Sequence, residues 1–196
     1  MNALYWVSKH IASFINHCVF FIKVIGKENT DNLGRVMIVS NHVSWYDPVM
    51  MGGIFKRKIH YMAKAELFKT KPVKYFLSRM GAFPVKRGAG DYGALKKSFE
   101  ILKADKCFGI FPEGTRFEEG KMGDFQRGAA AIALKMDAKI IPVYTKGTFK
   151  PFRQMKVIVG KAFSLKDRVN PKDKNAIDEG TKILKDALLQ LKQELV

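Results

Sequence analysis

The sequence has few cysteines and none of the common nucleotide-binding or metal-binding motifs. Its only two cysteines, Cys18 and Cys107, lie far apart in apolar surroundings. Their spacing is not that of a metal site, and it fits a reducing compartment without structural disulfides. The chain also has no Walker loop and no dinucleotide-binding glycine fingerprint, and it contains no internal repeat. We therefore predict no metal site and no repeat architecture.

Long apolar runs are absent as well. The longest uncharged apolar stretch, residues 10–22, contains polar residues and is too short to span a membrane. No small-residue cleavage site follows it, and Lys23 comes directly after it, which argues against a signal peptide. Residues 20–26 are rich in Val, Ile and Phe, so a first strand at this position is an alternative to a helix.

Residues 3–25 have the three- and four-residue spacing of an amphipathic helix. Such a helix lies either in a membrane interface or against the protein core. The aromatic residues and the basic character of the chain favour the membrane. We predict two units, an N-terminal amphipathic membrane-associating segment (residues 1–25) and a folded domain (residues 26–196). The apolar side of the predicted helix contains Leu4, Val7, Ile11, Phe14, Ile15, Cys18, Phe21 and Ile22.

Acidic residues are too few to balance the basic ones. The 196 residues carry a formal net charge of +17, and 47% of them are hydrophobic, which indicates a folded domain with a substantial core. The excess charge is concentrated in residues 55–103, which contain thirteen Lys or Arg and only three acidic residues. A basic cluster is typical of proteins that bind nucleic acid, an anionic membrane surface or phosphorylated small molecules. The alternative is a solvated basic surface.

Strand-like and helix-like segments alternate along the chain. This alternation predicts an α/β fold with a mostly parallel mixed sheet covered by helices on both faces. Functional residues of such folds gather where strands end, and His42, Lys64, Arg87, Glu113 and Arg116 all follow apolar runs. We predict strands at residues 36–39, 59–63, 107–111, 140–144 and 155–159, and helices at residues 48–55, 73–80, 91–103, 128–136 and 175–195.

His42 and Asp47 form the main catalytic hypothesis. His42 lies where the strand at residues 36–39 gives way to a loop, and Asp47 precedes Pro48 at the expected start of a helix. A carboxylate on one imidazole nitrogen fixes the tautomer and leaves the other nitrogen free to act as a general base. The alternative is a loop histidine beside a helix-capping aspartate.

Four ordered motifs resemble those of the glycerolipid acyltransferase superfamily, and they span about half of the chain. Within the superfamily, the chain most resembles the bacterial 1-acylglycerol-3-phosphate O-acyltransferases. The resemblance implies the glycerolipid acyltransferase fold. The motifs are Asn41-His42 with Asp47, the segment GAFPVKR at residues 81–87, the segment FPEGTR at residues 111–116, and the segment IPV at residues 141–143.

The resemblance also implies a reaction. An acyl chain passes from an acyl-CoA or acyl carrier protein thioester to the sn-2 hydroxyl of lysophosphatidic acid, and phosphatidic acid is formed for phospholipid biosynthesis. His42 fits as the base that activates the hydroxyl, with Asp47 as its orienting carboxylate. The chain has no GxSxG motif, so direct attack without an acyl-enzyme is the simpler scheme. We expect no cofactor, and a peripheral (monotopic) enzyme on the cytoplasmic face of the cell membrane.

A phosphorylated acceptor requires fixed cations. Arg116 and Arg87 suit this role because a guanidinium binds phosphate oxygens in a bidentate manner. Lys64, in a segment that resembles the Lys-x-Glu-Leu stretch of the family, adds a point charge. For all three residues, the alternative is an ordinary surface cation.

The FPEGTR segment supplies three more substrate-binding candidates. Glu113 positions either Arg116 or the hydroxyls of the acceptor, and its alternative is a buried structural carboxylate paired with an arginine. Gly114 permits a positive backbone φ at a tight turn, and Thr115 completes the set.

Other functions are also open from the sequence. The nearest alternative is an acyltransferase acting on another lyso-lipid or on an aminolipid. A basic nucleic-acid-binding protein belongs to a different class, but the chain lacks helix-turn-helix spacing and a zinc knuckle. A third alternative is an inactive membrane-binding module, against which the intact His42, Asp47 and Glu113 argue.

Overall fold

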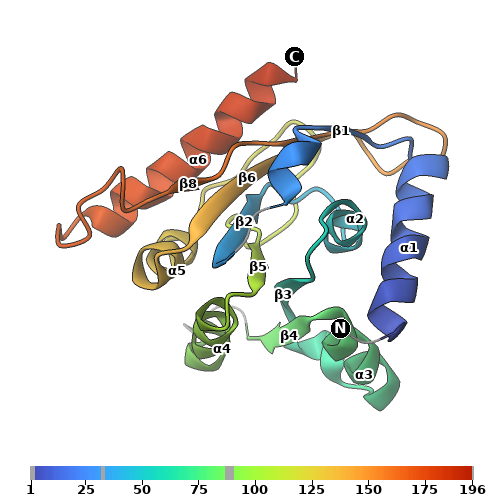
Figure 1. Cartoon of the computed structure of the whole chain (residues 1–196), viewed down its shortest axis with the longest axis horizontal. Coiled ribbons are helices and arrows are strands. Elements are labelled where there is room, and N and C mark those ends of the chain that lie inside the picture. Colours follow the sequence, from blue (N-terminus) through green and yellow to red (C-terminus); the bar gives the residue numbers. More distant parts are fainter. Residues whose placement is uncertain (1–2, 32–33, 87–90, 196) are drawn as a thin grey trace.

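A computed structural model describes residues 3–31, 34–86 and 91–195. Its helices pack on both faces of a central sheet (Figure 1). The helices are α1 (Ala3–Cys18), α2 (Asp47–Ile54), α3 (Lys71–Met80), α4 (Tyr92–Lys103), α5 (Gly128–Met136) and α6 (Ala176–Glu194), with 3-10 turns η1 (Lys27–Thr30) and η2 (Ala65–Phe68). The strands are β1 (Lys23–Ile25), β2 (Val36–Ser40), β3 (Ile59–Lys64), β4 (Ala82–Val85), β5 (Cys107–Ile110), β6 (Lys139–Lys146), β7 (Lys156–Val159) and β8 (Phe163–Ser164).

The sheet is mostly parallel. Its strand order is β1-β7-β6-β2-β5-β3-β4, and β8 pairs with β6 beside this path. Strand β2 lies at the centre, parallel to both β5 and β6. The antiparallel pairs are those that β6 makes with β7 and β8. The predicted α/β fold with a mostly parallel mixed sheet is therefore confirmed.

Strand β2 shows why the sheet is covered on both sides. All five of its residues are buried, as expected for a parallel strand between two helical layers. Met37 and Val39 belong to the core formed with α4, α5 and α6, whereas Val36 and Ile38 belong to the core formed with α2. Successive side chains of a strand point to opposite faces, so a continuous apolar run serves both cores.

The N-terminal segment differs from the prediction in its boundaries. Helix α1 ends at Cys18, and Lys23–Ile25 form strand β1, which pairs with β7 at the edge of the main sheet. The strand alternative for residues 20–26 is thus correct for its second half. Residues 23–25, which we assigned to the membrane segment, belong to the sheet of the folded domain.

Helix α1 docks on the core through a mixed face, on which Tyr5, Ala12 and Asn16 are buried. The Lys9 ammonium donates to the backbone carbonyls of Phe55 and Lys56, at 2.5 and 2.8 Å, just beyond the C-terminal end of α2. Asn16 is buried, and its side-chain amide donates to the Met50 carbonyl at 2.9 Å. The two Lys9 bonds occupy carbonyls just beyond α2, where the helical ladder no longer supplies a partner.

Most of the apolar side of α1 is exposed, whereas Ile15 packs against the core. Val7 is 56% exposed, Ile11 55% and Phe14 65%. Exposed apolar side chains on one helix face mark a surface that contacts a partner or a membrane. The two alternatives for this helix, a membrane interface and docking on the core, are therefore not exclusive. Helix α1 packs on α2 and also leaves most of its apolar side exposed. Among the described residues, no helix is long and apolar enough to cross a bilayer.

Close packing of α1 against α2 depends on Gly53. A Cβ atom at this position would lie 2.9 Å from the backbone nitrogen of Ser13 and 3.1 Å from the carbonyl carbon of Ala12. A Cβ atom at the adjacent Gly52 would meet nothing within 4 Å. The two glycines therefore form a matched pair, one required by packing and one free.

We predict that Gly53→Ala destabilises the fold and that Gly52→Ala does not. Overpacking at Gly53 forces α1 away from α2 and should lower the free energy of unfolding by about 1–3 kcal/mol. Gly52→Ala should be neutral or stabilising by roughly 0.5–1 kcal/mol, because alanine loses less backbone entropy within a helix. Urea titration followed by circular dichroism measures both. Equal effects of the two substitutions would contradict the proposed role of Gly53.

Candidate active site

Two of the sequence motifs meet at the carboxyl end of the central strands. Strands β2 and β5 are parallel neighbours, with Val39 in register with Ile110. The segments that follow them therefore leave the same edge of the sheet side by side. One of these segments contains His42, and the other is the FPEGTR loop at residues 111–116.

His42 and Asp47 form a hydrogen-bonded pair. The Nδ1 atom of His42 lies 2.7 Å from Oδ2 of Asp47, whose side chain is fully buried in the first turn of α2. The same oxygen accepts the backbone N–H groups of Val43 and Ser44, both at 2.9 Å. This network assigns the Nδ1 proton to the bond with Asp47, which leaves Nε2 as an acceptor.

The FPEGTR loop holds the backbone of His42 from both sides. One carboxylate oxygen of Glu113 accepts the N–H of His42 at 3.0 Å, and the other accepts the N–H of Gly123 at 2.9 Å. The N–H of Phe117 donates to the carbonyl of His42 at 2.9 Å. The ring of Phe111 stacks on the imidazole, with centroids 4.1 Å apart. The position of His42 is thus tied to this loop by backbone and ring contacts.

Glu113 is a buried carboxylate whose partners are backbone groups. Burial raises its pKa above the ordinary range of a glutamate, although the N–H groups of Gly123 and His42 act in the opposite direction. The sequence alternative of a structural carboxylate paired with arginine is correct in its burial and wrong in its partner, because both oxygens of Glu113 accept backbone N–H groups.

The rest of the FPEGTR loop faces outward. Gly114 has a φ of 68°, which confirms the expected positive backbone angle, and a Cβ atom there would lie 2.8 Å from Nε2 of Gln126. Thr115 and Arg116 are exposed. The Arg116 guanidinium makes no ion pair or side-chain hydrogen bond with any residue that the structure describes. It is therefore available to an external anion.

Of the other two candidate cations, Lys64 is not joined to this cluster. Lys64 is exposed at the carboxyl end of β3, where it pairs in register with Val85 of β4. It is not among the described residues that line the cavity beside His42. Arg87 lies outside the described residues.

An open cavity of about 720 Å³ lies beside His42. Most of its lining is apolar and comes from the ends of β3, β4 and β5 and from helices α4 and α5. The sequence predicted helices at residues 91–103 and 128–136 but gave no sign that one edge of each borders a cavity. The lining includes Met62, Val85, Ala94, Leu95, Ile110, Phe111, Ala129 and Ile132, with Lys86, Asp91 and Gln126 as polar members.

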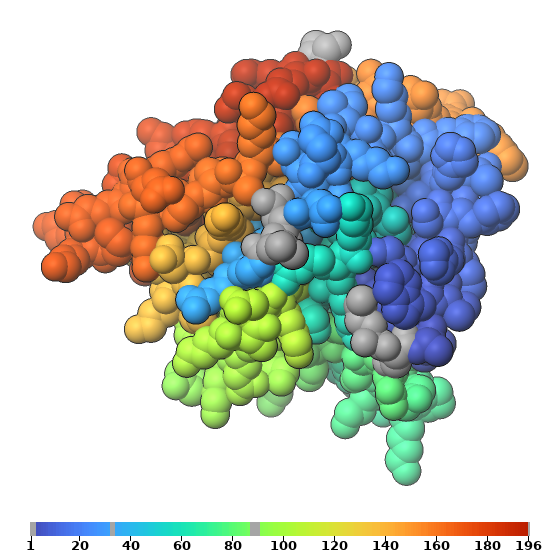
Figure 2. All heavy atoms as spheres, viewed as in Figure 1, coloured from blue at the N-terminus to red at the C-terminus, as the bar shows by residue number. Residues whose placement is uncertain are grey.

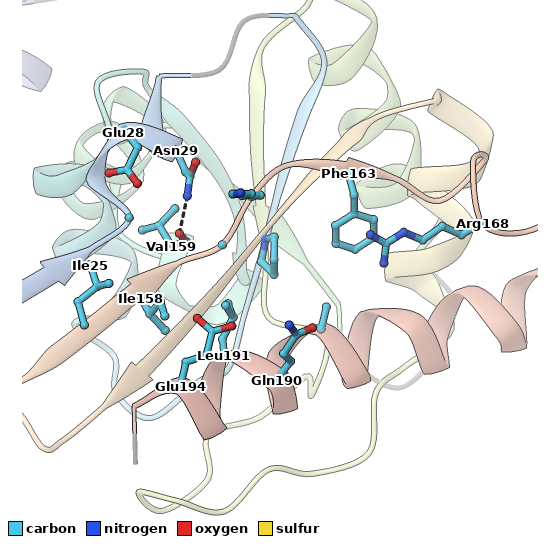
Figure 3. Close-up of a pocket in the computed structure, with 15 residues that line it drawn as sticks. Ile25, Glu28, Asn29, Ile158, Val159, Phe163, Arg168, Gln190, Leu191 and Glu194 are labelled. Atoms are coloured by element: carbon cyan, nitrogen blue, oxygen red, sulfur yellow. Dashed lines mark hydrogen bonds between the residues drawn. The ribbon is translucent and has the colours of Figure 1, made fainter.

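A second cavity, of about 520 Å³, lies between η1, strand β7 and helix α6 (Figure 3). The guanidinium of Arg168 stacks on the ring of Phe163 at one end, and the carboxylates of Glu28 and Glu194 lie among the remaining lining residues. None of the predicted site residues within the described chain lines this cavity. Within residues 3–31, 34–86 and 91–195, no group of three or more His, Cys, Asp or Glu side chains has the arrangement of a metal site.

Comparison with known proteins agrees with this geometry. The family model described as Acyltransferase matches residues 21–146. A 1-acyl-sn-glycerol-3-phosphate acyltransferase of Bacillus subtilis is 33% identical over 181 residues, which cover 89% of this chain and 89% of that protein. A chloroplastic 1-acyl-sn-glycerol-3-phosphate acyltransferase of Arabidopsis thaliana is 30% identical over 152 residues, which cover 74% of this chain and 42% of that protein.

A solved structure shares the fold. The crystal structure of the 1-acyl-sn-glycerophosphate acyltransferase PlsC from Thermotoga maritima aligns with a TM-score of 0.74 at 23% identity, covering 98% of this chain and 78% of that one. The family model covers more than half of the chain, and it includes both His42 and the FPEGTR loop. The chain therefore belongs to the acyltransferase family, among the PlsC-like glycerolipid acyltransferases.

Proposed function

We propose that the protein is a 1-acylglycerol-3-phosphate O-acyltransferase that converts lysophosphatidic acid to phosphatidic acid. The observation that carries the proposal is the His42–Asp47 pair, held by the FPEGTR loop beside an apolar cavity. The names of the relatives from Bacillus subtilis and Arabidopsis thaliana support the choice of acceptor. The acyl donor is a thioester of coenzyme A or of acyl carrier protein.

His42 acts as the general base in this scheme. Its Nε2 atom accepts the proton of the sn-2 hydroxyl while the hydroxyl oxygen attacks the thioester carbonyl carbon. The tetrahedral intermediate then collapses, the C–S bond breaks, and the thiolate takes the proton back from the imidazolium. Asp47 stabilises the imidazolium through the 2.7 Å bond to Nδ1. The scheme needs neither an acyl-enzyme nor a cofactor.

The surroundings of His42 supply the remaining functions. Glu113 holds the His42 backbone, and so acts as a positioning residue. Arg116 binds the acceptor phosphate, and the resemblance to the family adds Lys64 and Arg87 to this role. The apolar cavity beside His42 accommodates acyl-chain atoms, because its lining is largely aliphatic and aromatic.

The membrane is the source of the lipid acceptor. The exposed apolar side of α1, with Val7, Ile11 and Phe14, lies in the interface of an anionic membrane, and the net positive charge of the chain adds attraction. We infer a peripheral enzyme on the cytoplasmic face of the cell membrane.

The reaction is tested with labelled acyl-CoA and labelled acyl carrier protein thioester, each against a panel of lyso-lipids. We predict phosphatidic acid as the main product, formed from lysophosphatidic acid. A preference for another lyso-lipid or an aminolipid would overturn the choice of acceptor. No product from any pair would return the nucleic-acid alternative to consideration.

We predict that His42→Ala lowers kcat by about a hundred- to ten-thousand-fold, because it removes the base. Asp47→Asn should lower kcat comparably, since an amide holds the imidazole in the wrong tautomer. Steady-state kinetics measure both effects, and thermal unfolding serves as the control for folding. Near-normal turnover of a folded His42→Ala protein would remove the base assignment.

We predict that Arg116→Ala raises KM for lysophosphatidic acid about tenfold or more, with a smaller change in kcat. The effect should vanish with a monoacylglycerol acceptor, which lacks the phosphate. Lys135→Ala, an equal loss of charge on the exposed side of α5, is the matched control. If KM rises equally for both acceptors, Arg116 does not bind the phosphate.

A further inference from the structure

Helix α3 buries none of its residues within the described chain. It nevertheless carries large apolar side chains, of which Tyr75 is 58% exposed, Phe76 45% and Val73 43%. The preceding turn η2 adds Leu67, which is 52% exposed. Only Leu77 and Met80 of this helix are partly buried, so most of its large apolar side chains mark a surface that contacts another phase or molecule.

Local signals, rather than core packing, define this helix. Pro72 lies in its first turn, where its missing N–H costs nothing. Gly81 ends it in the left-handed conformation, with a φ of 99° and an N–H that reaches the carbonyls of Leu77 and Ser78. Pro72 and Gly81 thus define the two ends of the helix without core packing. Its exposed apolar side chains are not needed to hold it in place.

Basic side chains surround these apolar residues. Lys69, Lys71, Lys74 and Arg79 are all exposed, and Glu66 is the sole acidic residue of the sequence between residues 59 and 86. The guanidinium of Arg79 lies over the ring of Tyr75. Aromatic and aliphatic groups interspersed with lysine and arginine are typical of helices that lie in the interface of an anionic membrane.

The α3–η2 surface (residues 65–80) adjoins the exposed side of α1. Helices α1 and α3 are in contact, and Figure 1 places them at the same side of the molecule. In the space-filling view, the segment of α3 and η2 projects below α1 on that side (Figure 2). Two neighbouring helices that are far apart in the sequence thus both carry exposed apolar residues.

We propose that the α3–η2 surface is a second membrane-contact element, which binds anionic lipid together with α1. This inference extends the peripheral membrane association proposed above and does not depend on the acyl-transfer reaction. An acidic protein, such as acyl carrier protein, is the competing occupant. Exposed Tyr75, Phe76 and Leu67 favour the lipid, because amphipathic aromatic rings and aliphatic side chains lie readily at a bilayer interface.

Vesicle binding by the full-length protein, without substrates, tests the proposal. The vesicles contain either phosphatidylglycerol with phosphatidylcholine or phosphatidylcholine alone. The charge variant is Lys71→Gln with Lys74→Gln. Its matched control is Lys172→Gln with Lys174→Gln, an equal change of charge on exposed residues before α6, at the far end of the molecule. The apolar variant is Tyr75→Ser with Phe76→Ser.

The charge variant should bind anionic vesicles about 25-fold more weakly, since each of the two lysines near the surface contributes about fivefold. The control should change binding less than threefold. Both α3 variants should retain turnover of acceptor dispersed in detergent, because none of these residues contacts the His42 site. Unchanged vesicle binding by the charge and apolar variants, or an equal loss in the control, would overturn the proposal.

A tryptophan reporter tests lipid contact directly. The only two tryptophans, Trp6 and Trp45, are replaced by phenylalanine, and Phe76→Trp is added. Quenching of this tryptophan by brominated lipids in anionic vesicles is the expected result. If the tryptophan fluorescence of the vesicle-bound protein is not quenched, the lipid assignment is wrong. The lipid assignment is also wrong if the charge variant loses binding to acyl carrier protein but still binds vesicles. That result would identify the acidic protein as the occupant.

Discussion

The parallel pairing of β2 with β5 is the constraint on which the site depends. It carries two loops to one edge of the sheet, where the backbone of His42 exchanges hydrogen bonds with Glu113 and Phe117. These hydrogen bonds contribute to the stability of the folded state, because a buried backbone group without a partner costs about 1–3 kcal/mol. The imidazole is therefore oriented by Asp47 through its ring and by the FPEGTR loop through its main chain.

Helix α1 joins this site to the surface of the molecule. Its buried Asn16 accepts the hydroxyl of Tyr46 and donates to the carbonyl of Met50, and Tyr46 directly precedes Asp47. The docked face therefore combines polar Asn16 with buried Tyr5 and Ala12. A surface helix usually turns its apolar side to the core, so the exposed Val7, Ile11 and Phe14 mark a contact surface.

The apolar cavity beside His42 combines two requirements of lipid chemistry. Its aliphatic lining, with Leu95 and Ile132 as examples, is suited to hydrocarbon, whereas the exposed Arg116 is suited to a phosphate in water. His42 itself lines this cavity. An enzyme that joins an acyl chain to a phosphorylated acceptor needs both, because the two substrates differ in polarity at the atoms that do not react.

Local sequence was sufficient for most strands and helices and for the His42–Asp47 pair, because periodicity and a five-residue spacing act within one segment. It left strand β1 open and missed β8. It also determined the positive φ of Gly114, which a tight turn requires. Only the tertiary structure decided that Glu113 holds His42 rather than Arg116, and which side of α1 docks on the core. Both depend on contacts between segments 30 or more residues apart, such as Asn16 with Met50, and residue spacing along the chain does not encode those partners.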